Sequence, residues 1–131
     1  MKFLLLLYGD ETMWMDMSPE EMQQSVEAWN AYGEQLVEAG VLLGGEALAP
    51  TGEATTVRIE QGEVVRTDGP FAETREQLGG YYLLECKDID EAAGWAAKVP
   101  YLGEDGSVEV RPIVDWEAAA DEQAGAEASA G

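Results

Sequence analysis

Two segments of the sequence, residues 3–8 and 81–86, are apolar at both their odd and their even positions. This pattern is typical of β-strands that are covered on both faces of a sheet. The chain has 131 residues, which is enough for one domain but leaves no third layer to cover a second sheet face. The pattern therefore predicts a second copy packed sheet against sheet around a two-fold axis, because large exposed apolar patches are rare on monomers. The alternative is a monomer whose apolar face is shielded by residues 10–17 and by the C-terminal tail.

A helix is predicted over residues 19–39. Ser18 can cap its first turn, Pro19 suits the first helical position, and Glu21 completes a capping box. Gly40 is typical of the residue that follows a helix end.

The predicted elements follow the order strand, helix, strand, hairpin, strand, helix, strand. They cover residues 1–8, 19–39, 41–48, 55–67, 81–86, 89–99 and 107–114, with Gln61-Gly62 as the hairpin turn and Gly44-Gly45 as a bulge or a close backbone approach. This order predicts an α+β fold with a ferredoxin-like βαββαβ core and an inserted β-hairpin. The predicted domain spans residues 1–114, and residues 115–131 form a predicted mobile tail that is acidic and rich in Ala and Gly.

The side chains that the chain lacks exclude several kinds of site. There is no histidine, which excludes Ser-His-Asp and Cys-His nucleophilic machinery and His-ligated metals. The one cysteine, Cys86, allows no intramolecular disulfide and is expected to be a small buried hydrophobe. Seven basic and 27 acidic side chains give a net charge of −20, which argues against nucleic acid or an anionic membrane as a partner. The sequence indicates no cofactor and no metal.

The apolar run near the N-terminus is too short for a targeting or membrane segment. It has six residues, Phe3 to Tyr8, whereas the apolar region of a signal peptide needs about 7–15 residues and a membrane span about 18. We therefore expect a soluble cytoplasmic protein. The excess of acidic residues would also suit a salt-rich cytosol.

Asp68-Gly69-Pro70-Phe71 is the most conspicuous local motif, and it has two interpretations. In the functional one, Asp68 points a carboxylate into a cleft as a general base or a ligand anchor. In the structural one, Asp68 caps its own turn, Gly69 supplies an unusual φ, Pro70 stiffens the loop and Phe71 fills the core. Local chemistry alone favours the structural interpretation.

Four other residues are candidates for the polar lining of a ligand pocket. Arg111 lies among apolar strand neighbours, so it is expected either to bind an anion or to form a salt bridge. Tyr8 and Tyr81 either orient a ligand or pack in the core or the dimer interface. Glu46 would add a second carboxylate to Asp68 for acid–base chemistry if the fold brings the two together.

The segment 68–83, Asp-Gly-Pro-Phe-Ala-Glu-Thr-Arg-Glu-Gln-Leu-Gly-Gly-Tyr-Tyr-Leu, resembles the signature of the YCII-related family in its DGPF-motif branch. Residues 2–11, 44–48 and 106–112 are similar to other parts of that family. The resemblance covers about residues 1–114 and leaves the acidic tail outside.

The resemblance implies a dimeric α+β barrel built from two ferredoxin-like halves. It also implies an association with extracytoplasmic-function sigma factors, because relatives often accompany them in bacterial genomes. In the YCII branch a histidine and an aspartate are the proposed active site. That pair cannot be transferred to a chain that has no histidine.

Two hypotheses for function follow. In the first, the protein is a homodimer with a small-molecule pocket near the sheet and the dimer interface. Asp68 is then the candidate catalytic residue, Tyr8, Glu46, Tyr81 and Arg111 are the candidate ligand-binding residues, and any reaction is a histidine-free carboxylate acid–base reaction. In the second, it is a non-catalytic accessory or regulatory module that acts through protein contacts.

Overall fold

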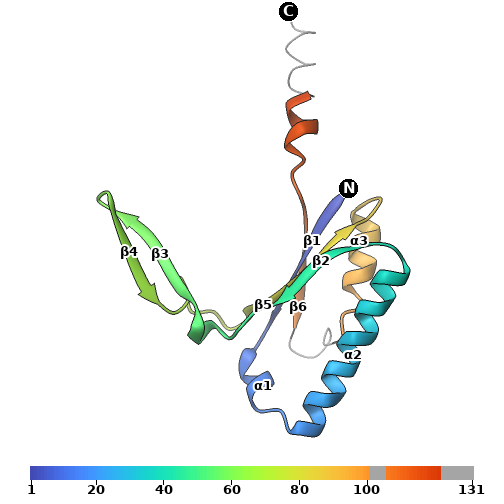
Figure 1. The fold of residues 1–131 in the computed structure, drawn as a ribbon, viewed down its shortest axis with the longest axis horizontal. Coiled ribbons are helices and arrows are strands. Elements are labelled where there is room, and N and C mark those ends of the chain that lie inside the picture. Colours follow the sequence, from blue (N-terminus) through green and yellow to red (C-terminus); the bar gives the residue numbers. More distant parts are fainter. Residues whose placement is uncertain (101–105, 122–131) are drawn as a thin grey trace, which may run out of the picture.

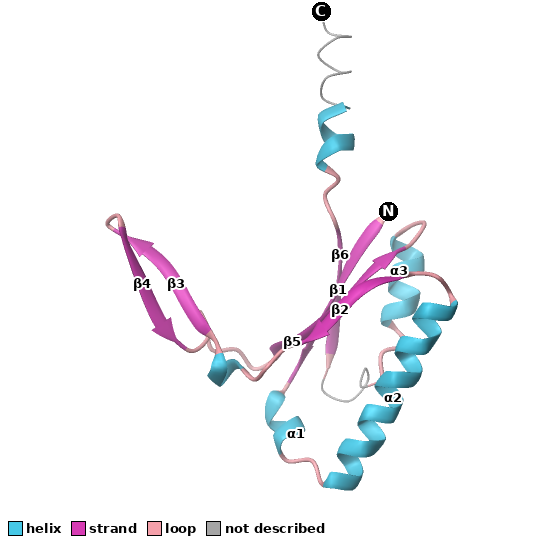
Figure 2. Cartoon of the chain, in the orientation of Figure 1, coloured by secondary structure: helices cyan, strands magenta, loops and turns pink. Residues whose placement is uncertain are grey.

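The computed structural model describes residues 1–100 and 106–121. It is an α+β fold built on a four-stranded sheet in which all neighbouring strands are antiparallel (Figure 1, Figure 2). The strand order is β2 (Leu42–Ala47), β5 (Gln77–Glu85), β1 (Lys2–Gly9) and β6 (Ser107–Pro112). Helix α2 (Pro19–Glu38) connects β1 to β2, and helix α3 (Ile89–Ala96) connects β5 to β6. The βαββαβ order of the predicted core is therefore present.

The two long helices begin where the sequence predicts. Ser18 accepts a hydrogen bond from the Glu21 amide at 3.1 Å, and the Glu21 side chain accepts one from the Ser18 amide, which completes the capping box of α2. Asp88 caps α3 by accepting from the Glu91 amide at 2.9 Å. These bonds satisfy backbone donors that a helix N-terminus would otherwise leave unpaired.

The core lies between the sheet and the two helices. Phe3 and Leu5 of β1, Leu84 of β5 and Leu36 of α2 are fully buried there. Because side chains alternate along a strand, this burial assigns the odd-numbered residues of β1 to the helix side. Within the core, the Tyr32 hydroxyl donates to the Trp95 carbonyl at 2.9 Å and so joins α2 to the C-terminal part of α3. Cys86 is buried in the same core, as expected, and burial raises the pKa of its thiol.

No helix of the described residues covers the other face of the sheet (Figure 1). Leu4, Leu6 and Tyr8 of β1 point to it, together with Tyr81 and Leu83 of β5, which pair with Leu6 and Leu4 across the sheet. The described strands do not close into a barrel within one chain. A single chain therefore leaves apolar side chains on this helix-free face.

The inserted hairpin forms a separate two-stranded sheet, β3 (Thr55–Glu60) and β4 (Glu63–Asp68). Its turn residues Gln61 and Gly62 have φ angles of 51° and 81°, as a tight hairpin turn with two left-handed positions requires. This arm extends away from the body, on the side of the sheet opposite to the helices (Figure 1).

Several boundaries differ from the prediction. β5 begins at Gln77 and not at Tyr81, because Gln77 pairs with Gly9 across a bulge in the ladder. The predicted loop after β1 contains a short helix, α1 (Glu11–Met15), which Asp10 caps. A 3-10 turn, η1 (Thr51–Glu53), precedes the arm. Residues 116–121 of the predicted tail are helical, and residues 122–131 lie outside the described part of the chain.

Candidate functional site

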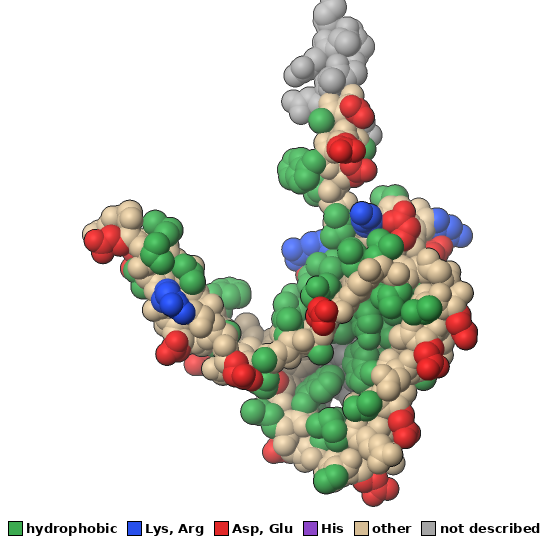
Figure 3. Space-filling view, viewed as in Figure 1, with side chains coloured by type: hydrophobic (Ala, Val, Ile, Leu, Met, Phe, Trp, Pro, Cys, Tyr) green, Lys and Arg blue, Asp and Glu red, His purple; other side chains and the backbone are tan. Residues whose placement is uncertain are grey.

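A cavity of about 560 Å³ opens between α1, α2 and the ends of β2 and β5. Figure 3 shows apolar side chains gathered in the hollow between the sheet and α2, with acidic side chains toward the outside. The apolar lining of the cavity comes from segments that are far apart in the sequence. Its residues include Leu7, Trp14, Met15, Trp29, Leu48 and Tyr82. The volume lies within the range of small-molecule sites, roughly 300–1,000 Å³.

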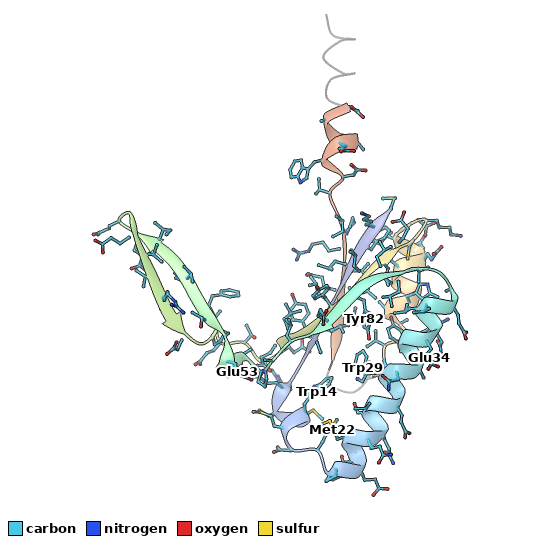
Figure 4. All side chains as sticks on the ribbon, in the orientation of Figure 1. Trp14, Met22, Trp29, Glu34, Glu53 and Tyr82 are labelled. Atoms are coloured by element: carbon cyan, nitrogen blue, oxygen red, sulfur yellow. The ribbon has the colours of Figure 1, made fainter. Side chains whose placement is uncertain are left out.

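Three aromatic rings form one wall of this cavity (Figure 4). Trp29 of α2 lies between Trp14 of α1 and Tyr82 of β5, with ring centroids 6.3 Å and 6.4 Å away and planes tilted by 31° and 20°. Tyr32 packs edge-on against Tyr82 behind them, with centroids 5.4 Å apart. Partial burial raises the pKa of the Tyr82 hydroxyl above its usual range. The wall therefore consists of large aromatic rings packed against one another, with Trp29 in the middle.

Two glycines allow β2 and β5 to approach closely at the floor of the cavity. A Cβ atom on Gly45 would lie 2.7 Å from the Tyr81 carbonyl oxygen, and one on Gly80 would lie 2.9 Å from the Glu46 carbonyl oxygen. Real side chains do not come this close to backbone, so both positions require glycine. The close approach predicted at Gly44-Gly45 is confirmed, and it occurs at the second of the two.

Glu11 connects the cavity wall to the base of the arm. Its carboxylate accepts hydrogen bonds from the amide and the hydroxyl of Thr51 in η1, and its own amide donates to the Gln77 side chain at 2.9 Å. Asp10 holds the first turn of α1 through the amide and hydroxyl of Thr12, and these bonds lower the pKa of Asp10. Glu11 is thus a positioned carboxylate that the sequence analysis did not single out.

Of the predicted site residues, Glu46 and Tyr81 lie together. They are directly paired between β2 and β5, and both contribute to the cavity lining. Tyr8 and Arg111 do not line this cavity. Arg111 of β6 is paired with Leu4 of β1, and Tyr8 has the same strand parity as Leu4. Tyr81 is paired with Leu6, and Glu46 is paired with Tyr81. Strand alternation therefore assigns the side chains of all four residues to the helix-free face.

Arg111 has a partner already. Its Nη2 atom lies 2.6 Å from Glu109 Oε1 in an exposed ion pair, which is the alternative that the sequence left open. Exposed pairs of this kind contribute roughly 0–1 kcal/mol. Arg111 is therefore not held in place by burial.

Asp68 lies apart from the other four, at the end of β4 on the arm. It is exposed and outside the cavity lining. The turn after it is held by the Gly69 amide, which donates to Ala54 at 2.7 Å, and by the Thr56 hydroxyl, which donates to the Gly69 carbonyl at 2.8 Å. Gly69 has the expected unusual φ, +101°. The expectation that Phe71 fills the core is wrong, because this residue is 76% exposed.

The aromatic residues of the cavity were not predicted as site residues. Trp29 has the spacing of a buried helix stripe, and Trp14 falls in a segment expected to be a loop. The signal that could have found α1 is Asp10 followed by Glu11 and Thr12, which is typical of a helix start.

No helix in the described part of the chain is both long and apolar enough to cross a membrane.

Comparison with known proteins identifies the family of this chain. The model of the YCII-related domain matches residues 1–117. The uncharacterized protein R00369 of Rhizobium meliloti (strain 1021) is 40% identical over 114 residues, which cover 86% of this chain and 92% of that protein. The chain belongs to the YCII-related family.

Proposed function

We propose that the protein is a homodimer that binds a small molecule in the cavity between α1, α2 and the β2–β5 end of the sheet. The observation that carries this proposal is the cavity itself, about 560 Å³ in volume and lined by Trp14, Trp29 and Tyr82. A concave, mainly apolar site with a few polar groups is the usual form of a small-molecule site. Glu11 and Gln77 supply polar side chains here.

The helix-free face supports the homodimer. Leu4, Leu6 and Leu83 lie at its centre, and Glu109 and Arg111 flank them on the edge strand β6. A second copy placed sheet against sheet would bury this apolar strip and complete the dimeric α+β barrel that the resemblance implies. The Asp68-Gly69-Pro70-Phe71 motif supports assignment to the DGPF branch of the family.

Any catalysis would depend on carboxylates, because the chain has no histidine. Glu11 is the general acid–base candidate of the cavity, because the side chain of Glu46, which also borders it, is assigned to the helix-free face by strand alternation. Asp68 lies outside the cavity of its own chain. A catalytic role for Asp68 therefore requires that the arm reach a site on a second copy.

A thermal-shift screen against several hundred metabolites and metal ions tests the binding function. A compound that binds only the folded state raises stability by about 2.7 kcal/mol at one hundred times its dissociation constant. We expect at least one concentration-dependent hit whose shift is lost in Trp14→Leu and kept in Trp116→Leu, since Trp116 is 77% exposed and does not line the cavity. If the thermal shift of every hit is unchanged in both variants, the hits do not bind in this cavity and the proposal is contradicted.

A second candidate function rests on the arm. Val57, Ile59 and Val64 are 58%, 66% and 66% exposed, and Ile59 pairs with Val64 across the hairpin. Isolated two-stranded hairpins are only marginally stable in water. An accessory role through protein contacts, for example with a cytoplasmic sigma factor, would use this surface. A pull-down with wild type and with Ile59→Lys separates this function from metabolite binding.

A further inference from the structure

We propose that the β3–β4 arm of one copy packs against the second copy, so that two arms clasp the homodimer. This inference rests on the proposed homodimer and adds a contact that the helix-free face alone does not provide. It follows from the exposure of the arm, from the side of the sheet on which the arm lies, and from the charges that the arm carries.

The arm buries little of its surface within its own chain. Thr56 and Val65 are half-buried, and every other residue of β3 and β4 is exposed. The two strands are rich in Thr, Val and Ile, which pack well on a half-buried sheet surface. A two-stranded hairpin that nothing covers is only marginally stable in water. The arm therefore has the composition of a strand pair that is covered in an assembly.

One face of the arm is apolar. Directly paired residues of two strands point to the same face, so Ile59 lies beside Val64, and Val57 lies beside Arg66. The opposite face carries a pair of glutamates next to the turn. We call the four residues Val57, Ile59, Val64 and Arg66 the apolar arm face, because it is the face that can bury apolar surface against a partner.

The position of the arm favours a second copy as that partner. The arm follows β2 and precedes β5, and it projects on the side of the sheet opposite to the helices (Figure 1). The helix-free face looks to the same side. A copy placed sheet against sheet would therefore lie next to the arm, and the arm would extend the proposed interface beyond the sheet.

The charges of the arm also suit a second copy. Two chains of net charge −20 repel each other, so a contact between them should use a surface with few acidic groups. The apolar arm face carries a single charged group, the guanidinium of Arg66. Within residues 1–100 and 106–121, the ion pairs join the N-terminal amine to Glu85 and Arg111 to Glu109. Arg66 is therefore available to a carboxylate of the acidic second copy.

The direct test uses the wild-type protein. Copies with isotope-labelled isoleucine methyl groups are mixed with unlabelled copies, and an isotope-filtered NOE experiment then detects only contacts between the two kinds of copy. We expect contacts from the methyl group of Ile59 on the arm. We expect none from Ile89 at the start of α3, which is half exposed but belongs to the helix layer on the other side of the sheet.

A pair of substitutions measures how much the contact contributes. Ile59→Lys places a charge on the apolar arm face, whereas Thr67→Lys places the same charge on the opposite face, because Thr67 pairs with Thr56. We expect Ile59→Lys to raise the dissociation constant of the dimer roughly a hundredfold in analytical ultracentrifugation, because each dimer loses two buried isoleucines. Thr67→Lys should stay close to wild type.

The outcomes separate this inference from the homodimer proposal. If the wild type is a dimer in which Ile59 gives no contact to the other copy, the arm does not clasp the second copy, and the homodimer proposal stands. Equal dissociation constants for the two lysine variants would overturn the inference in the same way. If the wild type sediments as a monomer, the homodimer proposal and the inference are contradicted together.

Discussion

The substitution Gly45→Ala tests how closely β2 approaches β5 at the cavity floor. The new Cβ atom would lie 2.7 Å from the Tyr81 carbonyl oxygen and 2.9 Å from the Tyr82 Cδ1 atom. The carbonyl belongs to the sheet backbone and cannot rotate away, so β2 must move by several tenths of an ångström. Overpacking of this kind costs about 1–3 kcal/mol, and the smaller conformational freedom of Ala in the unfolded chain returns about 0.4–1 kcal/mol. We expect a net loss of about 1–2 kcal/mol.

The matched control is Gly94→Ala, which makes the same chemical change in α3. A Cβ at Gly94 has no atom within 4 Å, and the position is exposed. Ala is favoured over Gly in a helix by about 0.8–1 kcal/mol, so this variant should be more stable than wild type.

The measurement is urea unfolding followed by tryptophan fluorescence and circular dichroism, at one protein concentration because a dimer's stability depends on it. Urea is preferred to guanidinium chloride, whose ions would screen the net charge of −20. The reasoning is refuted if Gly45→Ala unfolds at the wild-type urea concentration, or if both variants shift in the same direction by the same amount.

Three more predictions concern the helix-free face, the buried tyrosines and the charge. Leu6→Glu places a charge at the centre of the helix-free face and should shift the mass in light scattering from twice the 14.2 kDa of the chain to once that value; an unchanged mass would contradict the dimer. Burial raises the pKa of the Tyr32 and Tyr82 hydroxyls, so their contribution to stability is complete below pH 10 and should decline as the pH rises above it. Absorbance at 295 nm should show late titration of these tyrosines, and a single transition at pH 10 for all five would contradict this. Raising KCl from low to molar concentration should raise the urea midpoint because screening relieves repulsion among 27 acidic side chains, and a flat response would contradict this.

Most of the secondary structure could be predicted from local signals. The capping residues Ser18 and Asp88 mark the starts of α2 and α3, and Gln61-Gly62 marks the hairpin turn, because each signal depends only on neighbouring backbone geometry. The apolar runs of β1 and β5 predicted two occupied faces. One of these faces is the core, and the other is the helix-free face that the homodimer proposal fills.

The cavity could not be predicted in the same way. Its aromatic wall joins Trp14, Trp29 and Tyr82, which come from three elements and meet only in the tertiary structure. The start of β5 at Gln77 was hidden because the pairing with Gly9, and not apolar periodicity, makes that segment a strand. The arm separates Asp68 from Glu46, and no local pattern sets the direction in which a hairpin leaves a sheet.

The measurement that tests the central claim most directly is an NMR titration of the isotope-labelled protein with the strongest hit of the thermal-shift screen. Binding in the cavity predicts that the largest shift changes fall on the Trp14 and Trp29 indole signals and on the Gly45 and Gly80 amides, which line it. Changes centred on Ile59 and Val64 of the arm, or on Leu4 and Leu83 of the helix-free face, with the cavity signals unmoved, would contradict the claim.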